Sequence, residues 1–575
     1  MENKTLADIF YEIAEYLSID KEPTSRFESK AYEKAGFTIE TLQEPIQEIY
    51  EKHGKEGLMQ LPGIGKGLAE KIEEFIKTGS IKKYDELRKK YSIDLHSLGN
   101  IEGLGIKRAI SLYKALGIKN ADDLKKAVDE KKVRSVPGFG EKSEEAISNA
   151  LKLIEARSSR VLLGHALPIA EQLVLELNKT GFVKKIEISG SIRRMKETIG
   201  DIDILAISEK PEEVIKAFTD FDDVESVVAK GNTKVTVWLK IGISCDLRVI
   251  SPKSFASALQ YFTGSKEHNI DVRKIAISRG YKLNEYGLFN KKDIAIKCET
   301  EADIYSRLGM DYIPPEMRED RGEIKLAQEH KIPKLIELND LKGDLHMHTN
   351  DSDGQNTLEE MAAAAEKNKL EYIAITNHTK SLKVANGLDE KRFRALFHKI
   401  DLLNDKSNGI RILKGGEVDI LKDGSLDLNR SVLDEMDVII GAVHSGFRMD
   451  RKTMTGRIIK AIESGINILA HPTGRLINKR MPYDIDLEEI SEACEKNNVA
   501  LEINSFPDRL DLNDSNILLA SKYKLMFSID TDAHETEHLK FLKYGIGTAR
   551  RGWLTKNQVI NTMSLKDLKN ILKKR

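Results

Sequence analysis

Apolar and polar positions follow a helical period in the first part of the chain and change character after it. In residues 6–17 apolar side chains recur at the spacing of one helix face, and residues 1–155 show no strand pattern. Residues 156–310 carry short β-rich runs between helices, such as the alternating run at 235–239. From Leu341 helical and strand-like segments alternate almost to the end. The pattern predicts a multidomain protein with a helical, then an α+β, then an α/β part.

Length and composition fit several intracellular domains. The chain has 575 residues, of which 40% are hydrophobic, and this is enough for separate cores. A net charge of -1 gives no global basic signal, so any nucleic-acid site must be local. Three scattered cysteines argue against a disulfide framework and suit a reducing compartment. Because the pattern contains neither a signal peptide nor a membrane-length apolar run, we expect a cytoplasmic protein without a membrane partner.

Three short repeats in the helical part share the pattern apolar-x-Gly-apolar-Gly, at residues 61–65, 101–105 and 136–140. Their glycines permit tight turns, and the free amides of the helix that follows suit a phosphate. One copy could be a packing turn. Three copies beside Lys66, Arg108 and Lys142 favour helix-hairpin-helix motifs, which contact the DNA backbone without reading bases. The DNA-binding candidates are Gly63, Gly65, Gly103, Gly105, Gly138 and Gly140.

A group of carboxylates follows in the β-rich part. Asp201 and Asp203 lie two residues apart in an apolar, strand-like run, so their side chains point to the same side. Asp246 follows the alternating run, and a neighbouring strand can bring it to the same point. Three converging carboxylates fit two hard cations about 4 Å apart, the arrangement for in-line phosphoryl transfer. We therefore predict a catalytic site that holds Mg²⁺, or Mn²⁺ in its place.

A phosphate-binding segment precedes these carboxylates. Gly190 and Ser191 form a turn that leads into Arg193 and Arg194, and paired guanidinium groups suit phosphates. A D-x-D motif alone could be a solvated strand end, but together with this segment it is typical of a nucleotidyltransferase. That class includes enzymes that act on small molecules, and it is the three hairpins that favour DNA.

Histidines and carboxylates end successive strand-like runs after residue 340. A His-x-His sequence on a strand presents both imidazoles on one face, and ligands at strand ends are where a barrel assembles its site. The candidates are His346, His348, Asp353, His378, Glu417, His444, His471, Asp532 and His534. A lone histidine at a strand end is usually an ordinary hydrogen-bonding residue. This repeated, mixed set instead suits up to three ions such as Zn²⁺, Mn²⁺ or Fe²⁺.

From about residue 5 to 318 the chain resembles the family X DNA polymerases. Besides the motifs above, three segments are similar to that family's nucleotide-pocket turn and thumb motifs: residues 261–265, 284–287 and 312–316. The resemblance implies triphosphate contacts from Gly190, Ser191 and Arg194. It places Tyr261 and Phe262 near the incoming sugar.

The same resemblance implies roles for four more residues. Gly264 would let a helix bend, Asn269 and Arg273 would lie at the minor groove, and Arg248 would contact DNA beside Asp246. Lys71 aligns with the family's Schiff-base lysine, which removes 5′-deoxyribose phosphate. In a lysine-rich helix most lysines are solvated, so both interpretations of Lys71 stay open.

From about residue 340 to 570 the chain resembles the polymerase-and-histidinol-phosphatase (PHP) domain, whose nine ligand positions match the nine candidates above. Asn377 stands where that family usually has aspartate, and we interpret it as a neighbour of the ligands. The resemblance implies 3′→5′ exonuclease, abasic-site endonuclease and 3′-phosphatase activities, which the sequence does not rank.

These observations predict six segments: a lyase-like helical domain (1–88), a fingers-like helical domain (89–151), a nucleotidyltransferase palm (152–252), a thumb (253–318), a charged linker (319–338) and a PHP α/β barrel (339–575). We expect a gap-filling DNA repair polymerase with a 3′→5′ exonuclease. Its partners would be gapped or nicked duplex DNA and deoxynucleoside triphosphates, without an obligate protein partner. The alternatives are a PHP nuclease with a vestigial polymerase, a non-catalytic DNA-binding scaffold, and a PHP phosphatase of small metabolites.

Overall fold

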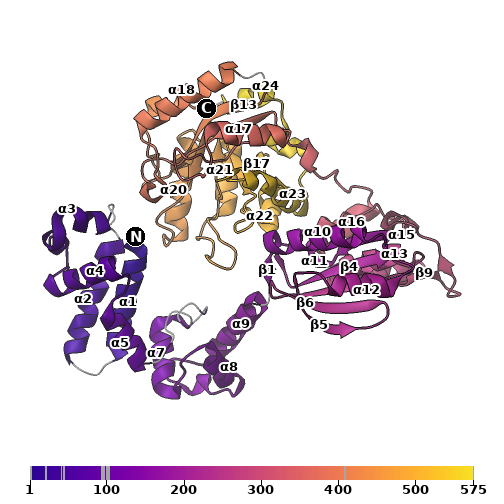
Figure 1. The fold of residues 1–575 in the computed structure, drawn as a ribbon, viewed down its shortest axis with the longest axis horizontal. Helices are drawn as coiled ribbons and strands as arrows, with labels where there is room; N and C mark the ends of the chain where they lie inside the picture. Colours follow the sequence, from indigo (N-terminus) through magenta and orange to yellow (C-terminus); the bar gives the residue numbers. More distant parts are fainter. Residues whose placement is uncertain are drawn as a thin grey trace. The chain divides into compact units, whose positions relative to one another are not determined.

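The computed structural model describes the chain except for residues 1–2, 20–22, 41, 43–45, 92, 94–97, 99–100, 102–103, 159, 407–408 and 574–575. The chain divides into two compact units, Met1–Ser158 and Ser159–Arg575. In Figure 1 the first unit runs from indigo to purple and the second from magenta to yellow. Each unit has hydrophobic cores of its own.

Helices make up the described regular structure of the first unit, as the apolar spacing predicts. They are α1 (Asn3–Ile19), α2 (Pro23–Glu40), α3 (Ile46–Met59), α4 (Lys66–Thr78), α5 (Lys82–Tyr91), α7 (Gly105–Leu116), α8 (Ala121–Asp129) and α9 (Glu141–Ser158), with one 3-10 turn, η1 (Val133–Ser135). Their apolar faces share one core, in which Phe10 and Ile13 of α1 are fully buried. Burial of these faces is what stabilises helices of this length.

A five-stranded sheet carries the carboxylates in the second unit. Its strands lie in the order β2 (Lys185–Ser189), β4 (Asp201–Ile207), β7 (Ser244–Val249), β6 (Lys234–Leu239) and β5 (Val224–Lys230). β4 and β7 are parallel, and the other neighbours are antiparallel. Helices α10 (Leu163–Lys179) and α12 (Pro211–Thr219) share a core with the sheet, in which Leu173 and Phe218 are buried. The short strands β1 (Val161–Leu162) and β3 (Thr198–Ile199) form a separate antiparallel pair.

Four helices and a small sheet follow. They are α13 (Phe255–Thr263), α14 (Lys266–Ser278), α15 (Glu301–Arg307) and α16 (Glu323–Gln328), with β8 (Tyr281–Asn284), β9 (Gly287–Asn290) and β10 (Ala295–Ile296). Residues 319–338, predicted to be a linker, contain α16. Leu335 is buried in the core of this region and Ile336 in the core of the next. The segment therefore packs against both regions, while the predicted domain boundaries stay predictions.

Seven parallel strands in chain order form the last region. They are β11 (Gly343–Asp344), β12 (Tyr372–Ile375), β13 (Arg411–Asp419), β14 (Val438–Ala442), β15 (Ile468–Leu469), β16 (Ala500–Asn504) and β17 (Phe527–Asp530). Beyond β11 and β17 the backbones meet again: Met347 bridges Ala533, and the His348 amide donates to the Ala533 carbonyl (2.7 Å). The sheet is a nearly closed barrel, which confirms the predicted fold class.

Helices connect these strands and lie around them (Figure 1): α17 (Leu358–Lys367), α18 (Glu390–Lys406), α20 (Arg451–Glu463), α21 (Leu487–Asn497), α22 (Asp514–Ala520) and α23 (Leu542–Arg551). Leu413 and Ile440 of the strands pack in one cluster with Leu568 of α24 (Leu565–Leu572). Burial on both faces explains why these strands read as continuous apolar runs. Among the described helices, none is long and apolar enough to cross a membrane.

Candidate functional site

Three carboxylates meet on neighbouring strands of the five-stranded sheet. β4 holds Asp201 and Asp203, and β7 holds Asp246. The parallel register sets Asp203 directly beside Asp246, so the predicted triad lies together on one face. Thr236 of β6 pairs with Asp246 from the other side and donates its hydroxyl to that carboxylate.

Protein cations balance this negative charge only in part. Burial, reinforced by the charges of Asp201 and Asp246, raises the pKa of Asp203 to about 7. Lys234 and Arg248 lie 2.9 and 3.0 Å from Oδ2 of Asp246, so they neutralise mainly that carboxylate. The arrangement therefore favours an additional cation.

The turn between β2 and α11 (Gly190–Arg193) lies against the triad. Gly190 has a φ of +70°, and a Cβ there would lie 2.7 Å from Oδ2 of Asp203, so the turn requires glycine. The Ser191 hydroxyl oxygen is buried, and within the described residues it makes no hydrogen bond. A buried hydroxyl without a partner is costly, and this favours an external acceptor such as a phosphate.

The two arginines after this turn have different neighbours. Arg193 forms hydrogen bonds of 3.0 and 2.6 Å with the Glu301 carboxylate of α15. Arg194 donates from Nε to Glu319 (2.9 Å) and from Nη1 to the Thr263 carbonyl. Both arginines therefore join the turn to the region that follows the sheet, Arg193 through α15 and Arg194 through α13 and Glu319.

The predicted sugar-contact residues end helix α13. The Tyr261 and Phe262 rings meet edge to face, with centroids 5.2 Å apart, and the Arg248 guanidinium lies 4.5 Å from the Phe262 ring. Asn269 is buried, and its amide binds the Tyr261 carbonyl (2.7 Å) and the Gln260 side chain (2.8 Å). These two bonds use one donor and one acceptor of the amide, and a second N–H remains for the predicted contact with a substrate.

Two further predicted residues flank the same helices. Gly264 has a φ of +70°, and a Cβ there would lie 3.1 Å from Nη1 of Arg194, so glycine leaves room for that arginine. Arg273 is exposed on α14, where its Nε donates to the Asn269 carbonyl (3.2 Å). The roles of these residues toward nucleotide or DNA stay predictions.

The first and third hairpins expose their turns. Gly63 and Gly138 have φ values of +80° and +87°, which glycine adopts without strain. A Cβ at Gly65, Gly138 or Gly140 would meet nothing within 4 Å. The space beside these turns is therefore open to a ligand.

The second hairpin is described in part. Gly105 begins α7, while Gly103 lies outside the described residues. Arg108 of α7 lies over the Phe139 ring of the third hairpin at 4.3 Å, so these two hairpins pack together.

Lys71 lies on α4, behind the first hairpin. Its Nζ forms an ion pair with Glu74 (2.7 Å), and the lysine side chain is 30% exposed. The structure thus places a partly exposed, paired lysine at this position, and its lyase role stays a prediction.

The nine predicted metal ligands of the barrel converge at the carboxyl ends of its strands. Glu417 lies within β13, and the others follow β11, β12, β14, β15 and β17. Three groups offer ligand atoms within 4.8 Å of one another: His348, Asp353, His378 and His534; His346, His348 and Glu417; and His378, Glu417 and His444. The remaining two adjoin them, since Nε2 of His471 is 2.9 Å from Glu417 and Oδ1 of Asp532 is 3.2 Å from His348.

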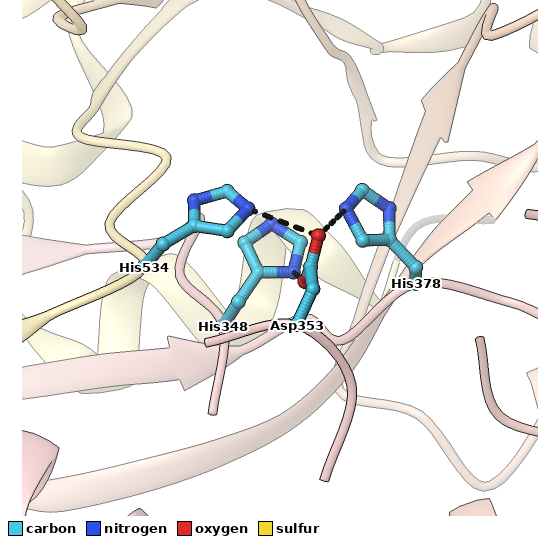
Figure 2. Close-up of side chains that lie close together, drawn as sticks. All are labelled: His348, Asp353, His378 and His534. Atoms are coloured by element: carbon cyan, nitrogen blue, oxygen red, sulfur yellow. Dashed lines mark ion pairs between the residues drawn. The ribbon is translucent and has the colours of Figure 1, made fainter. Parts of the chain in front are cut away.

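Figure 2 shows the largest of these groups. The Asp353 carboxylate points between the rings of His378 and His534, and its Oδ2 lies 3.3 and 3.5 Å from their Nε2 atoms. The His348 ring stacks on both of them, with centroid distances of 4.3 Å.

Buried donor atoms around Glu417 lack the partners that their burial requires. Nδ1 of His378 approaches Oε2 of Glu417 to 2.7 Å, yet within the described residues neither atom forms a hydrogen bond. The same holds for Nε2 of His346 and both ring nitrogens of His348. Unsatisfied nitrogen and oxygen atoms that converge in a buried space fit a bound cation.

The sequence patterns missed two carboxylates that orient these histidines. Glu502 of β16 binds Nδ1 of His346 (2.6 Å), and Asp419 of β13 binds Nδ1 of His444 (2.7 Å). Such bonds direct the other ring nitrogen toward a metal. A glutamate at the centre of the fully buried strand β16 is the signal that could have identified Glu502.

Asn377 lies beside the ligands and holds their loop. Its Oδ1 accepts from the Thr349 amide (2.8 Å) and the Ser352 hydroxyl (2.9 Å), and its Nδ2 donates to the Thr349 hydroxyl (2.8 Å). These bonds fix the backbone next to Asp353. Arg509, which no pattern singled out, brings its Nε to 3.6 Å from Oδ2 of Asp532 and places a positive charge beside the ligands.

Comparisons with known proteins assign these regions to families. Four family descriptions match: "Helix-hairpin-helix domain" at residues 1–81, "SAM-like Helix-hairpin-helix tandem" at 96–153, "DNA polymerase beta thumb" at 258–319 and "PHP domain" at 344–506. The matches confirm the predicted hairpins, thumb and PHP region.

Curated relatives match either the whole chain or about a third of it. "DNA polymerase/3'-5' exonuclease PolX" from Bacillus subtilis (strain 168) is 38% identical over 578 residues, which is 100% of both chains. A "Probable phosphatase" from Caldicellulosiruptor saccharolyticus is 30% identical over 207 residues, 34% of this chain and 80% of that protein. A probable phosphatase from Thermoanaerobacter sp. (strain X514) is 28% identical over 231 residues, 38% and 89% respectively. The chain therefore belongs to the family X DNA polymerases that carry a C-terminal PHP domain.

Proposed function

We propose that the protein fills gaps in duplex DNA during repair and that its barrel site removes nucleotides from 3′ ends. The observation that carries this proposal is the carboxylate triad, in which burial and two like charges raise the pKa of Asp203 to about 7. The printed name of the Bacillus relative combines a polymerase with a 3′-5′ exonuclease. An intact triad speaks against a vestigial polymerase, and three convergent ligand groups speak against an inert scaffold.

The triad suits Mg²⁺, or Mn²⁺ in its place. Asp201, Asp203 and Asp246 offer only oxygen ligands, and the excess negative charge around Asp203 fits a hard cation. When bound, such ions supply positive charge that stabilises the phosphoryl group during its transfer.

The chain's own side chains would orient the two substrates. The Ser191 hydroxyl, which has no hydrogen-bond partner among the described residues, and Arg194 bind the triphosphate. Tyr261 and Phe262 lie beside the incoming sugar. Asp246, the triad carboxylate on the neighbouring strand β7, is the one that accepts the proton of the primer 3′-hydroxyl in this proposal. Catalysis then depends mainly on position and charge.

The barrel site suits Zn²⁺ or Mn²⁺, with room in its ligand set for up to three ions. Imidazole nitrogens dominate the three ligand groups, and several of them are buried without a hydrogen bond to any described residue. When bound, such ions activate water and stabilise charge on phosphoryl oxygens. Glu502 and Asp419 orient the histidines, and Arg509 offers a positive charge to the phosphate of the bond that is cut.

A 3′-phosphatase activity of the barrel is a second candidate. The two relatives named probable phosphatases match about a third of this chain, at a length that fits the barrel region alone. A terminal 3′-phosphate and an internal phosphodiester present the same phosphoryl group to the ligands. Abasic-site cleavage would use that chemistry as well.

Gapped or nicked duplex DNA and deoxynucleoside triphosphates are the substrates that we propose. The hairpins contact backbone phosphate on both sides of a gap, and Lys71 is the candidate for removing a 5′-deoxyribose phosphate. The three cysteines are buried and free, which suits a reducing compartment, and we place the protein in the cytoplasm.

One experiment tests both sites. The full-length protein is incubated with a gapped duplex, with and without nucleotides, in Mg²⁺ and in Mn²⁺, and the product lengths are measured. We expect extension to the gap end with nucleotides and shortening from the 3′ end without them. A duplex that ends in a 3′-phosphate tests the second candidate, since released phosphate can be measured. Absence of extension in both ions would overturn the polymerase proposal.

A further inference from the structure

A buried arginine of the barrel region reaches the residues proposed to bind the triphosphate. Arg551 ends helix α23 and is 4% exposed. Its Nη1 donates to Glu319 (2.9 Å) and to the backbone carbonyl of Arg194 (2.8 Å), and its Nη2 binds Asp514 of α22. A buried guanidinium with carboxylates on two of its nitrogens is held in one position.

Glu319 is shared between this arginine and the polymerase site. Its Oε1 accepts 2.9 Å hydrogen bonds from both Arg551 and Arg194, and its Oε2 lies 3.4 Å from Lys196. Burial alone would raise the pKa of Glu319, but Arg551, Arg194 and Lys196 hold it at about 2. The carboxylate is therefore ionised at neutral pH, and three cations share its charge.

The Nη2 nitrogen of the Arg194 guanidinium takes no part in the bonds to described residues that hold this side chain. Its Nε is bound to Glu319 and its Nη1 to the Thr263 carbonyl, and these two bonds fix the plane of the group. Within the described residues, Nη2 makes no hydrogen bond. That nitrogen, and the part of the positive charge that Glu319 does not neutralise, are what a triphosphate can use.

We propose that Arg551 is a positioning residue for nucleotide binding: it neutralises Glu319, so that Arg194 keeps its charge and its free nitrogen for the triphosphate. Without Arg551, the Glu319 carboxylate would be balanced only by Arg194 and Lys196. It would then compete with the incoming triphosphate for Arg194, and nucleotide affinity would fall. The inference rests on the role proposed above for Arg194.

Other contacts keep α23 in register with the sheet region. A Cβ on Gly547 of α23 would lie 2.5 Å from the Met195 side chain, so the helix approaches that segment closely. Lys543 of α23 binds Glu171 of α10 (2.8 Å). Arg551 is therefore placed by a packed interface, and its bond to Glu319 is part of that interface.

Steady-state extension of a primed, gapped duplex by the full-length protein tests the proposal. Arg551→Met keeps much of the side-chain volume and removes the charge. We expect the KM for the nucleotide to rise roughly tenfold, the size expected for one charge-assisted hydrogen bond, and kcat to change less than about threefold. Arg550→Met is the matched control, because Arg550 is the neighbouring residue of α23 and its side-chain partners among the described residues are Glu316 (2.7 Å) and the Ile336 carbonyl (2.9 Å), not Glu319 or Arg194. Its KM should stay within about twofold.

A second substitution separates charge balance from general loosening. In the double variant Arg551→Met with Glu319→Gln, the competing charge is gone, so the KM should return to within about threefold of the original. Nuclease activity should be retained in every variant, which shows that the barrel is folded. An unchanged KM for Arg551→Met, an equal rise for Arg550→Met, or a failure of Glu319→Gln to restore the KM would each overturn the proposal. If Arg551→Met does not fold, Arg551→Gln carries the test, because it removes the charge and keeps a hydrogen-bond donor; the same rise in KM is expected, and an unchanged KM would overturn the proposal.

The variant Arg194→Met distinguishes the role of Arg551 from the role proposed for Arg194, on which it depends. If its KM is unchanged, the proposed role of Arg194 fails. If its KM rises and that of Arg551→Met does not, only the role of Arg551 fails.

Discussion

The two candidate metal sites of this chain differ in their ligand types and in the burial of those ligands. The sheet site consists of three carboxylates on two parallel strands, and Asp201 is exposed. The barrel site is rich in imidazole, and its His346 and His348 are fully buried. Carboxylates with partial access to solvent suit hard ions that exchange with the substrate, whereas buried, oriented imidazoles suit ions that stay. These differences predict an exchangeable site in the sheet and a resident one in the barrel.

The largest expected effect is the loss of primer extension when the sheet site is changed and the barrel site is left intact. Asp203→Ala removes the carboxylate at the centre of the triad, so extension of a gapped duplex should fall at least roughly a thousandfold, because the positioning and charge that drive phosphoryl transfer are lost. Shortening of 3′ ends should persist. Ser244→Ala, beside Asp201 in the register, is the matched control and should keep extension within about threefold. Substantial extension by Asp203→Ala would remove the triad from the mechanism.

The reciprocal change removes two imidazoles from the barrel. His346→Ala with His348→Ala takes ligands from two of the three groups, so bound metal and 3′→5′ degradation should be lost together, by roughly a hundredfold or more. Extension on an unblocked gap should stay within about threefold. Elemental analysis and product lengths measure both outcomes. Undiminished degradation would place the nuclease elsewhere, and lost extension would refute the separation.

A smaller effect is expected at the hairpins, which we propose hold the DNA. Gly138→Val forces a β-branched residue to a φ of +87° at an open turn, so binding to a gapped duplex should weaken about tenfold. Gly79→Val is the matched control, since Gly79 also has a positive φ (+73°) and open space but caps the end of α4 that is opposite the hairpin turn. Fluorescence anisotropy should show a steep loss of affinity with salt and little dependence on base sequence. Equal weakening by both variants would indicate general strain and not hairpin contact.

The smallest effect concerns Asn377. Asn377→Asp keeps the acceptor for the Thr349 amide and the Ser352 hydroxyl, and the Thr349 hydroxyl can turn to donate. Degradation rate and metal content should therefore change less than about threefold. Asn377→Leu, which keeps the size but removes these bonds, should lower both clearly. Equal behaviour of the two variants would contradict the structural role of this amide.

Sequence patterns predicted those site residues whose positions depend on the local geometry of a strand or a strand end. Two residues of spacing in a strand place Asp201 and Asp203 on one side, and a strand end places a histidine at the mouth of a barrel. Partners far apart in sequence were not predictable in this way. Glu502 lies 156 positions from His346, which it orients, and a buried glutamate on a strand does not identify its partner.

The segment 319–338 shows that charged residues in a sequence are not always exposed in the structure. Its many charged residues suggested a linker, yet Glu323 is fully buried in a 2.7 Å contact with His268, which is also fully buried. Glu319 is buried among arginines. A charged residue is usually exposed unless it has a partner, and a single sequence does not reveal the partner.

The bond between Arg551 and the Arg194 carbonyl joins positions 357 residues apart, and this distance matters during synthesis. The ribosome delivers the sheet and its carboxylates first, and α23 emerges among the last segments of the chain. Until then, Leu510 and Tyr544, which complete the core around the sheet, are missing as well. Domains fold as they emerge. In the nascent chain, the sheet region would therefore keep an exposed apolar surface until translation ends. The charge of Glu319 would likewise lack the Arg551 partner until then.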